Sequence, residues 1–229
     1  MPAVITSATN PTLKLVRKLL AQKRKREELG LFAVEGEDLV DAALEAGLEP
    51  IELLVAGETV AAELVAELST LPHPARRIGV FRTADLPREA REVVLALWQV
   101  RDPGNVGTLL RTADAFGAAL SLSPGCADPL APKALRASVG SVFRVPLVPW
   151  GEAEGRRVAL VAHGGTPLHE LDLAGQVVFL LGAERDGLPS ELLAEPGTLA
   201  ATIPLGGRAE SLNVAAAGAV ALYERGRRG

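Results

Sequence analysis

The segment RDPGNVGTLLRTADAFGA, residues 101–118, sets two chemically capable side chains among small and apolar residues. Asn105 can donate and accept hydrogen bonds, and Arg111 can bind a phosphate or a carboxylate. Residues 102–105 are dense in turn formers, and apolar residues at 106, 109, 110, 113 and 116 have the spacing of a helix with one buried stripe. The segment holds no His, Cys or Ser, so chemistry here would rest on orientation and charge.

Two more polar loops directly follow apolar runs. GAERDGLP follows VVFLL, and LGGRAESLN follows ATI. Open α/β sheets bind their ligands at the carboxyl ends of strands, which makes these loops and RDPGNVG candidates for a binding site. Glu184, Ser211 and Asn213 supply the polar groups, among glycines that allow close backbone approach. Neither G-x-G-x-x-G nor G-x-x-x-x-G-K-[ST] occurs, which disfavours a nucleotide-binding oxidoreductase.

The elements that must position these loops form two α/β units. The first unit is expected to have strands at 31–36, 51–56 and 78–82, with helices at 37–46 and 58–68. Residues 84–91 are polar and proline-interrupted, which indicates a linker. The second unit is expected to have strands at 93–100, 118–123, 158–164, 177–182 and 199–205, and a last helix over 211–225. The sequence therefore predicts an α/β protein with domains at 1–86 and 92–229.

A basic helix is expected near the N-terminus, in a chain whose formal net charge is −4. Asn10 and Pro11 are typical of a helix N-cap and first position, and residues 13, 16, 19 and 20 form its apolar stripe. No acidic residue interrupts the seven cations between positions 14 and 26, so phosphate-backbone binding and a solvated charged face both stay open. The candidate RNA-binding residues are Lys14, Arg17, Lys18, Lys23, Arg24, Lys25 and Arg26.

Composition excludes several classes of protein. Hydrophobic residues make up 48% of the chain and aromatic residues 3%, as in an Ala/Leu/Val-packed globular protein. Cys126 is the only cysteine, which excludes an internal disulfide and a cysteine metal cage, and His163 and His169 fit no common metal spacing. No apolar run reaches the roughly 18 residues of a membrane span, so we expect a cytoplasmic protein with no metal and no membrane contact.

For Arg136 and Ser138, packing on the sheet and contact with RNA or a dimer mate both stay open.

Taken together, the three loops resemble the three motifs of the SpoU family of RNA 2′-O-ribose methyltransferases, within the SPOUT superfamily. DPGNVGTLLRTADAFGA looks like motif one, LLGAERDGLP motif two and IPLGGRAESLNVAAAGAVALYE motif three. ITSATNPTLKLVRKL and FAVEGEDLVDAAL look like the ribosomal-protein-like substrate-binding domain that precedes many members. Motif two departs at Arg185, where members commonly have Gly, and at Pro189, where many have Ser.

This resemblance implies a parallel sheet with a deep trefoil knot, which binds S-adenosylmethionine and pairs as a homodimer. By motif position, Gly182, Ile203 and Leu212 would border the cofactor, largely through backbone groups. The implied catalytic pocket consists of Asn105, Arg111, Glu184, Ser211 and Asn213. The family sometimes casts Arg111 as the base. A guanidinium is effectively always protonated, so clamping a phosphate beside the target ribose is physically the easier role.

The expected function is methyl transfer from S-adenosylmethionine to a ribose 2′-hydroxyl. Ribosomal RNA is favoured over transfer RNA, because the long recruiting domain resembles that of ribosome-directed members. A non-catalytic RNA-binding assembly protein of the same fold is the rival from another class. Residues 214–222 are almost all Ala, Val, Gly and Leu, which predicts a helix buried nearly all round. The resemblance makes a subunit interface the expected partner of that helix.

Overall fold

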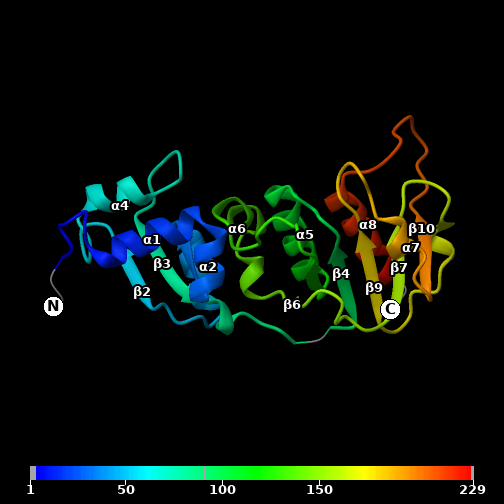
Figure 1. The fold of residues 1–229 in the computed structure, drawn as a ribbon, viewed down its shortest axis with the longest axis horizontal. Coiled ribbons are helices and arrows are strands. Elements are labelled where there is room, and N and C mark those ends of the chain that lie inside the picture. Colours follow the sequence, from blue (N-terminus) through cyan, green and yellow to red (C-terminus); the bar gives the residue numbers. More distant parts are fainter. Residues whose placement is uncertain (1–3, 90, 228–229) are drawn as a thin grey trace.

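The computed structural model describes residues 4–89 and 91–227, which form an elongated molecule with two sheets (Figure 1). The N-terminal part has a three-stranded antiparallel sheet of order β1-β3-β2. Its elements are α1 Pro11–Ala21, α2 Lys23–Leu29, β1 Leu31–Glu35, α3 Glu37–Glu45, β2 Glu52–Val55, α4 Ala62–Leu68, β3 Arg77–Arg82 and the short 3-10 helix η1 Thr83–Asp85.

The expected N-cap of the basic helix is confirmed, but the basic residues 14–26 are divided between two helices. The Asn10 side chain accepts a hydrogen bond from the backbone N–H of Thr12 at 2.8 Å, and the apolar stripe of α1 is buried. The helix stops because Gln22 is extended, at φ −127° and ψ 110°, and α2 begins at the next residue. This break lets the side chain of Arg26 fold back onto the carbonyl oxygens of Leu19 and Leu20.

The second part is a seven-stranded parallel sheet of order β6-β5-β4-β9-β7-β10-β8. Its strands are β4 Val93–Leu97, β5 Ala119–Leu122, β6 Leu147–Val148, β7 Arg156–Leu160, β8 Thr166–Pro167, β9 Val177–Leu181 and β10 Thr198–Thr202. Its helices are α5 Pro103–Ala115, α6 Pro132–Ser138, η2 Ser141–Phe143, η3 Leu168–Glu170, α7 Ser190–Leu193 and α8 Val214–Gly226. The α/β class is therefore confirmed, with the parallel sheet in the second part.

Several expected boundaries shift for local reasons. The strand expected to reach residue 100 ends at Leu97, because Gln99 adopts a left-handed backbone with φ 48°. The last helix begins at Val214 instead of residue 211, because the Asn213 side chain accepts hydrogen bonds from the first-turn N–H groups of Ala215 and Ala216. The strands β6 and β8 have two residues each, too few for a periodic pattern to reveal.

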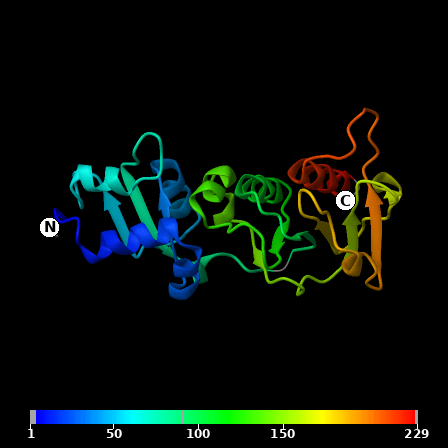
Figure 2. The ribbon, with the colours of Figure 1, turned by 45° about the horizontal axis from the view of Figure 1, so that its top comes forward.

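The helices α5 and α8 lie side by side along one face of the parallel sheet (Figure 2). Alternate residues of β4 face opposite layers: Leu95 and Leu97 belong to the main core, whereas Val94 and Ala96 belong to a smaller cluster on the other face. A Cβ on Gly218 of α8 would lie 2.5 Å from a methyl carbon of Leu109, so glycine there permits close packing of α8 on α5.

The described residues contain no helix with the length and hydropathy to cross a bilayer. Their His, Cys, Asp and Glu side chains also form no cluster suited to hold a metal ion. Cys126 is a buried thiol that lies 3.2 Å from the carbonyl oxygen of Leu97, a packing position at the end of β4.

Candidate functional site

The topology brings the three polar loops together. β4 and β9 are parallel neighbours in the middle of the sheet, and the Trp98 N–H bonds the Leu181 carbonyl at 2.8 Å. The loops that follow these two strands therefore leave the sheet side by side. Asn105 donates from Nδ2 to Oε1 of Glu184 at 3.0 Å, and Asn213 donates from Nδ2 to Oδ1 of Asn105 at 3.1 Å. One side chain from each loop thus joins a single hydrogen-bonded chain, the Asn105–Glu184–Asn213 network.

The network fixes which way its amides face. A carboxylate only accepts hydrogen bonds, so the NH2 group of Asn105 must face Glu184, and its oxygen is left to accept from Asn213. Glu184 also accepts from the backbone N–H groups of Arg101 at 3.3 Å and Asp102 at 3.2 Å. Burial raises the pKa of Glu184, but these hydrogen bonds outweigh it and leave the pKa below its ordinary value. Glu184 is therefore ionised at neutral pH and is a poor proton acceptor.

Two helix N-termini hold the network in place. The Asp102 carboxylate caps α5 by accepting from the Asn105 backbone N–H at 3.0 Å, and Lys133 Nζ lies 3.2 Å from its other oxygen. The Asn105 N–H, followed by the Lys133 ammonium, lowers the pKa of Asp102. Asn213 caps α8 with the oxygen of the same amide whose nitrogen reaches Asn105. The Asn213 side chain therefore serves both helix capping and site assembly, which restricts its rotamer.

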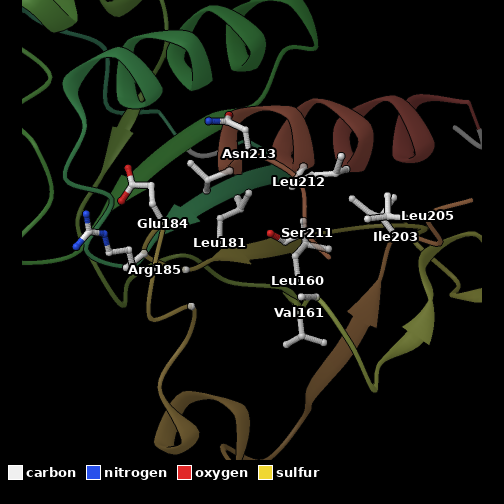
Figure 3. Close-up of a pocket in the computed structure, with 16 residues that line it drawn as sticks. Leu160, Val161, Leu181, Glu184, Arg185, Ile203, Leu205, Ser211, Leu212 and Asn213 are labelled. Atoms are coloured by element: carbon white, nitrogen blue, oxygen red, sulfur yellow. The ribbon is translucent and has the colours of Figure 1, made fainter. Parts of the chain in front are cut away.

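A cavity of about 440 Å³ adjoins this network. Figure 3 shows Glu184 and Asn213 toward one end, with Leu160, Val161 and Ile203 toward the other. The cavity is lined by Leu160, Val161, Ala162, Leu181, Gly182, Ala183, Glu184, Arg185, Gly187, Ile203, Leu205, Ser211, Leu212, Asn213, Val214 and Ala217. All three residues expected to border a cofactor, Gly182, Ile203 and Leu212, are in this lining.

Gly182 is demanded by the shape of the loop after β9. Ala183 and Gly187 exchange backbone hydrogen bonds at 3.1 and 3.0 Å, which closes a tight turn over Gly182. A Cβ on Gly182 would lie 2.2 Å from the carbonyl carbon of Gly187 and 2.4 Å from the nitrogen of Leu188. No side chain fits there unless the backbone moves, so the turn and the cavity wall depend on this glycine.

Arg111 and Ser211 are both exposed. Ser211 lines the cavity, whereas Arg111 lies on α5, six residues beyond Asn105, and is not among the lining residues. Within the part of the chain that the structure describes, neither side chain makes a hydrogen bond or ion pair. Both side chains are therefore available to a ligand, Ser211 at the cavity and Arg111 on the surface of α5.

The seven basic candidates fall into three groups. Lys14, Arg17, Lys18 and Arg24 are exposed and have no ion-pair partner among the described residues. Lys23 lies 3.7 Å from Glu27, and Lys25 lies 2.8 Å from Glu28. Arg26 is 5% exposed and is ion-paired with Asp128 at 2.6 Å. The structure thus removes Arg26 from the surface, because it pairs with the distant Asp128. Glu27 and Glu28, which directly follow the basic run in the sequence, pair with Lys23 and Lys25.

Sequence reasoning missed Lys133 and the capping role of Asp102. Asp102 precedes a Pro at the first helical position, which is a recognisable N-cap signal. Lys133 carries no such signal, because 31 residues separate it from its partner and only the packing of α6 against α5 brings it there.

Comparison with known proteins identifies the family. Residues 92–223 match the model of the SpoU rRNA Methylase family, and residues 10–82 match an MRM3-like substrate binding domain. The chain belongs to the SpoU rRNA methylase family. The SpoU match covers the whole parallel sheet, α5 and most of α8, and the second match covers the antiparallel sheet.

Relatives agree over nearly the full length. The chain is 34% identical to the 23S rRNA (guanosine(2553)-2′-O)-methyltransferase RlmP of Bacillus subtilis, over 96% of this chain and 97% of the relative. It is 30% identical to the 23S rRNA (uridine(2479)-2′-O)-methyltransferase of Streptomyces viridochromogenes, over 95% and 90%. An AdoMet-bound rRNA methyltransferase from Sinorhizobium meliloti superposes with a TM-score of 0.85 at 33% identity, over 99% and 98% of the two chains. The SpoU domain is thus preceded by a substrate-binding domain in an arrangement shared with full-length relatives.

Proposed function

We propose that this protein transfers a methyl group from S-adenosylmethionine to a ribose 2′-hydroxyl of ribosomal RNA. The observation that carries the proposal is the Asn105–Glu184–Asn213 network, which joins all three SpoU motifs at the mouth of one cavity. Two relatives that align over at least 90% of their own length are named as 23S rRNA 2′-O-methyltransferases. Transfer RNA is the alternative substrate.

The cavity suits S-adenosylmethionine in size and chemistry. Its volume of about 440 Å³ lies in the range of small-molecule sites. Leu160, Ile203 and Leu212 offer apolar contact for an adenine ring, and the backbone around Gly182 offers hydrogen bonds without side chains in the way. Bound there, S-adenosylmethionine supplies an electrophilic methyl group on a sulfonium sulfur.

The protein's own groups then have to present the ribose. The 2′-hydroxyl oxygen attacks in line as its proton is lost, so positioning contributes most of the rate gain. Ser211 and Asn213 lie where they can orient the hydroxyl, and Glu184 keeps Asn105 and Asn213 in place through the network. Arg111, with no partner in the described residues, is suited to hold the phosphate beside that ribose. Neither Glu184, whose pKa is lowered, nor the Arg111 guanidinium is a good base, so we assign the proton to solvent.

Transfer of radioactive methyl groups to purified RNA tests this function. Ribosomal RNA lacking its 2′-O-methyl groups should accept label from S-adenosylmethionine, and mapping the modified riboses should locate the nucleotide. Transfer RNA is tested in parallel. If only transfer RNA is labelled, then transfer RNA, and not ribosomal RNA, is the substrate. A protein that binds RNA but transfers no methyl group to either would be the non-catalytic assembly protein.

The unpaired cations of α1 and α2 support an RNA-binding role. We expect replacement of Lys14, Arg17, Lys18 and Arg24 by Gln to weaken RNA binding and to flatten its dependence on salt. Each lost phosphate contact should reduce the log–log slope by about 0.7 to 0.9. The matched control is Lys23→Gln with Lys25→Gln, because acids already pair these two lysines. An equal loss of slope per replaced cation in control and test variants would leave no special role for the unpaired cations.

A homodimer through α8 is part of the proposal. Burial of residues 214–222 nearly all round is not reached within a single chain, because Val220 is 37% exposed. Tyr223, one position further along α8, is 60% exposed. With Ala216 they form an apolar stripe at helical spacing, and Phe116 at the end of α5 is 44% exposed. A second copy of the chain is the partner we assign to this face, as the family resemblance implies.

Val220→Arg tests this interface without entering the cofactor cavity, whereas Ala217 lines that cavity and is a poorer choice. We expect the wild-type protein to sediment as a dimer at micromolar concentration and Val220→Arg as a monomer with weaker methyl transfer. A charge in a covered apolar patch has no partner and resists burial. Leu29→Arg, at a 45% exposed position on α2, is the control that should remain dimeric. A monomeric wild-type protein with full activity would contradict the interface.

We also assign the trefoil knot of the family and a cytoplasmic location to this chain. β10 lies next to the edge strand β8 of the parallel sheet. From β10 the chain runs back through residues 203–213 to the middle of the sheet, where α8 packs on α5 and β9. Such a return past the loop after β9 is the path a knot requires. A lone, reduced cysteine and an RNA substrate suit the cytoplasm.

A further inference from the structure

The boundary between the two domains is a continuous core. The ring of Phe32 on β1 stacks on Phe143 of the SpoU domain with centroids 6.2 Å apart, and on Phe81 of its own sheet at 5.8 Å. A Cβ on Gly140 would lie 2.7 Å from the Cβ of Ala42 in α3, so the two domains touch at backbone distance. Such an interface leaves little freedom for the domains to rotate against each other.

One largely buried ion pair joins the two domains across this boundary. Arg26 of α2 donates from Nε to Oδ2 of Asp128 at 2.8 Å, and the two side chains are 5% and 12% exposed. The same guanidinium bonds the carbonyl oxygens of Leu19 and Leu20 at the end of α1. Arg26 therefore ties the C-terminal end of the basic helix to the SpoU domain.

A second ion pair crosses it at the end of β1. Glu35 is 2% exposed and accepts a hydrogen bond from Arg136 of α6 at 2.9 Å. Glu35 also accepts hydrogen bonds from three donors of its own domain. They are the backbone N–H of Thr70 at 2.8 Å, the hydroxyl of Ser69 at 3.3 Å and the hydroxyl of Thr70. The carboxylate would stay hydrogen-bonded without Arg136, so Arg136 adds the link between domains.

Arg136 is also connected to the site through the close packing of α6 on α5. α6 packs tightly on α5, where a Cβ on Gly107 would lie 2.5 Å from Ala137 and 2.6 Å from the Ala134 carbonyl. α5 carries Asn105 and Arg111, and Lys133 of α6 contacts the Asp102 cap of α5. A rigid path therefore runs from the substrate-binding domain through α6 to the residues that face the ribose.

The Arg26–Asp128 pair is buried, whereas Arg136 reaches the buried Glu35 from a partly exposed position. A buried ion pair gains little net stability, because desolvation offsets much of its attraction, but separating its charges is costly, because one charge is then left buried without a partner. A shared apolar core alone would tolerate small rotations more readily. We propose that Arg136 and Arg26 are positioning residues, which hold the RNA-recruiting domain at a fixed register to the methyl-transfer pocket and so determine which ribose is methylated. This inference rests on the proposed function.

The test compares Arg136→Gln with Arg144→Gln in the full-length protein. Arg144 is the matched control: it is 47% exposed against 39% for Arg136, and its ion pair with Asp114 lies wholly within the SpoU domain. For Arg136→Gln we expect affinities for S-adenosylmethionine and RNA within about threefold of wild type, a kcat about tenfold lower, and methyl groups spread to neighbouring riboses. Arg136→Lys should restore much of the selectivity, because it keeps a charge opposite Glu35.

A purely structural role would lower thermal stability and total activity in both variants without moving the modified nucleotide. Wild-type kcat and selectivity in Arg136→Gln would overturn the inference. An independent readout needs no activity: spin labels on cysteines introduced at exposed Glu58 and Glu154 report the distance between the domains. We expect a narrow distribution in wild type and a broader one in Arg136→Gln. If no RNA is methylated by the wild-type protein, the proposed function fails, while an unchanged distance distribution would show that the positioning role fails.

Discussion

Arg111→Ala is expected to lower turnover at least about 100-fold while the affinity for S-adenosylmethionine stays near that of wild type. Arg111 is exposed on α5, outside the cavity lining, and no described residue pairs with it. A phosphate of the substrate would be its first partner, so its loss should be felt in the RNA complex and not in cofactor binding. Single-turnover methylation and a separate cofactor titration measure the two effects.

Arg111→Lys is expected to recover little of this loss, because an ammonium group lacks the two-pronged geometry of a guanidinium. The control is Arg82→Ala, which removes an exposed arginine from the other domain that lies 4.0 Å from Asp85. Near-normal turnover of the alanine variant would exclude Arg111 from the phosphate-clamp role. A parallel loss of cofactor affinity would move its role into the cavity.

Gly182→Ala is expected to weaken binding of S-adenosylmethionine by about 10- to 100-fold, and methyl transfer with it. The added Cβ would meet three backbone atoms of Gly187 and Leu188 at 2.2 to 2.5 Å, so the turn over the cavity must open. Overpacking of this kind costs about 1 to 3 kcal/mol, and each 1.4 kcal/mol is tenfold in affinity. Calorimetric titration measures the effect.

Gly206→Ala is the matched control for this glycine. Gly206 lies in the loop of motif three, where an added Cβ has no heavy atom within 4 Å. It should bind the cofactor nearly as well as wild type. Equal affinity in Gly182→Ala would mean that the turn after β9 adapts, and that its backbone does not form the cofactor-binding wall.

Local signals in the sequence were sufficient to predict where several helices and strands begin. Asn10 caps α1 and β4 begins at Val93 as expected, because capping and apolar runs act over a few neighbouring residues. The resemblance to the SpoU motifs implied that Gly182, Ile203 and Leu212 border one cofactor, and all three line one cavity. The break at Gln22 escaped prediction, because nothing near it in the sequence disfavours a continuous helix.

Partners of charged side chains could not be predicted in the same way. Arg26 was one of seven candidate RNA-binding residues in the basic run, yet Asp128, 102 residues away, holds it inside the protein. Arg136 likewise has a partner that no local pattern predicts: α6 packs on α5, and Arg136 of α6 pairs with Glu35 of β1. Electrostatic partners depend on which surfaces meet, and that depends on the docking of whole domains.

The sequence by itself determined the family, the strands and helices that position the site, and the residue types available to it. The tertiary structure alone decided that Asn105, Glu184 and Asn213 form one hydrogen-bonded chain, because β4 and β9 pair as neighbours although about 80 residues separate their loops. It also decided which cations of the basic run are unpaired among the described residues and that Arg26 joins the two domains. Hydrogen bonds and ion pairs act over a few ångströms, so only the packing of distant segments can assign them.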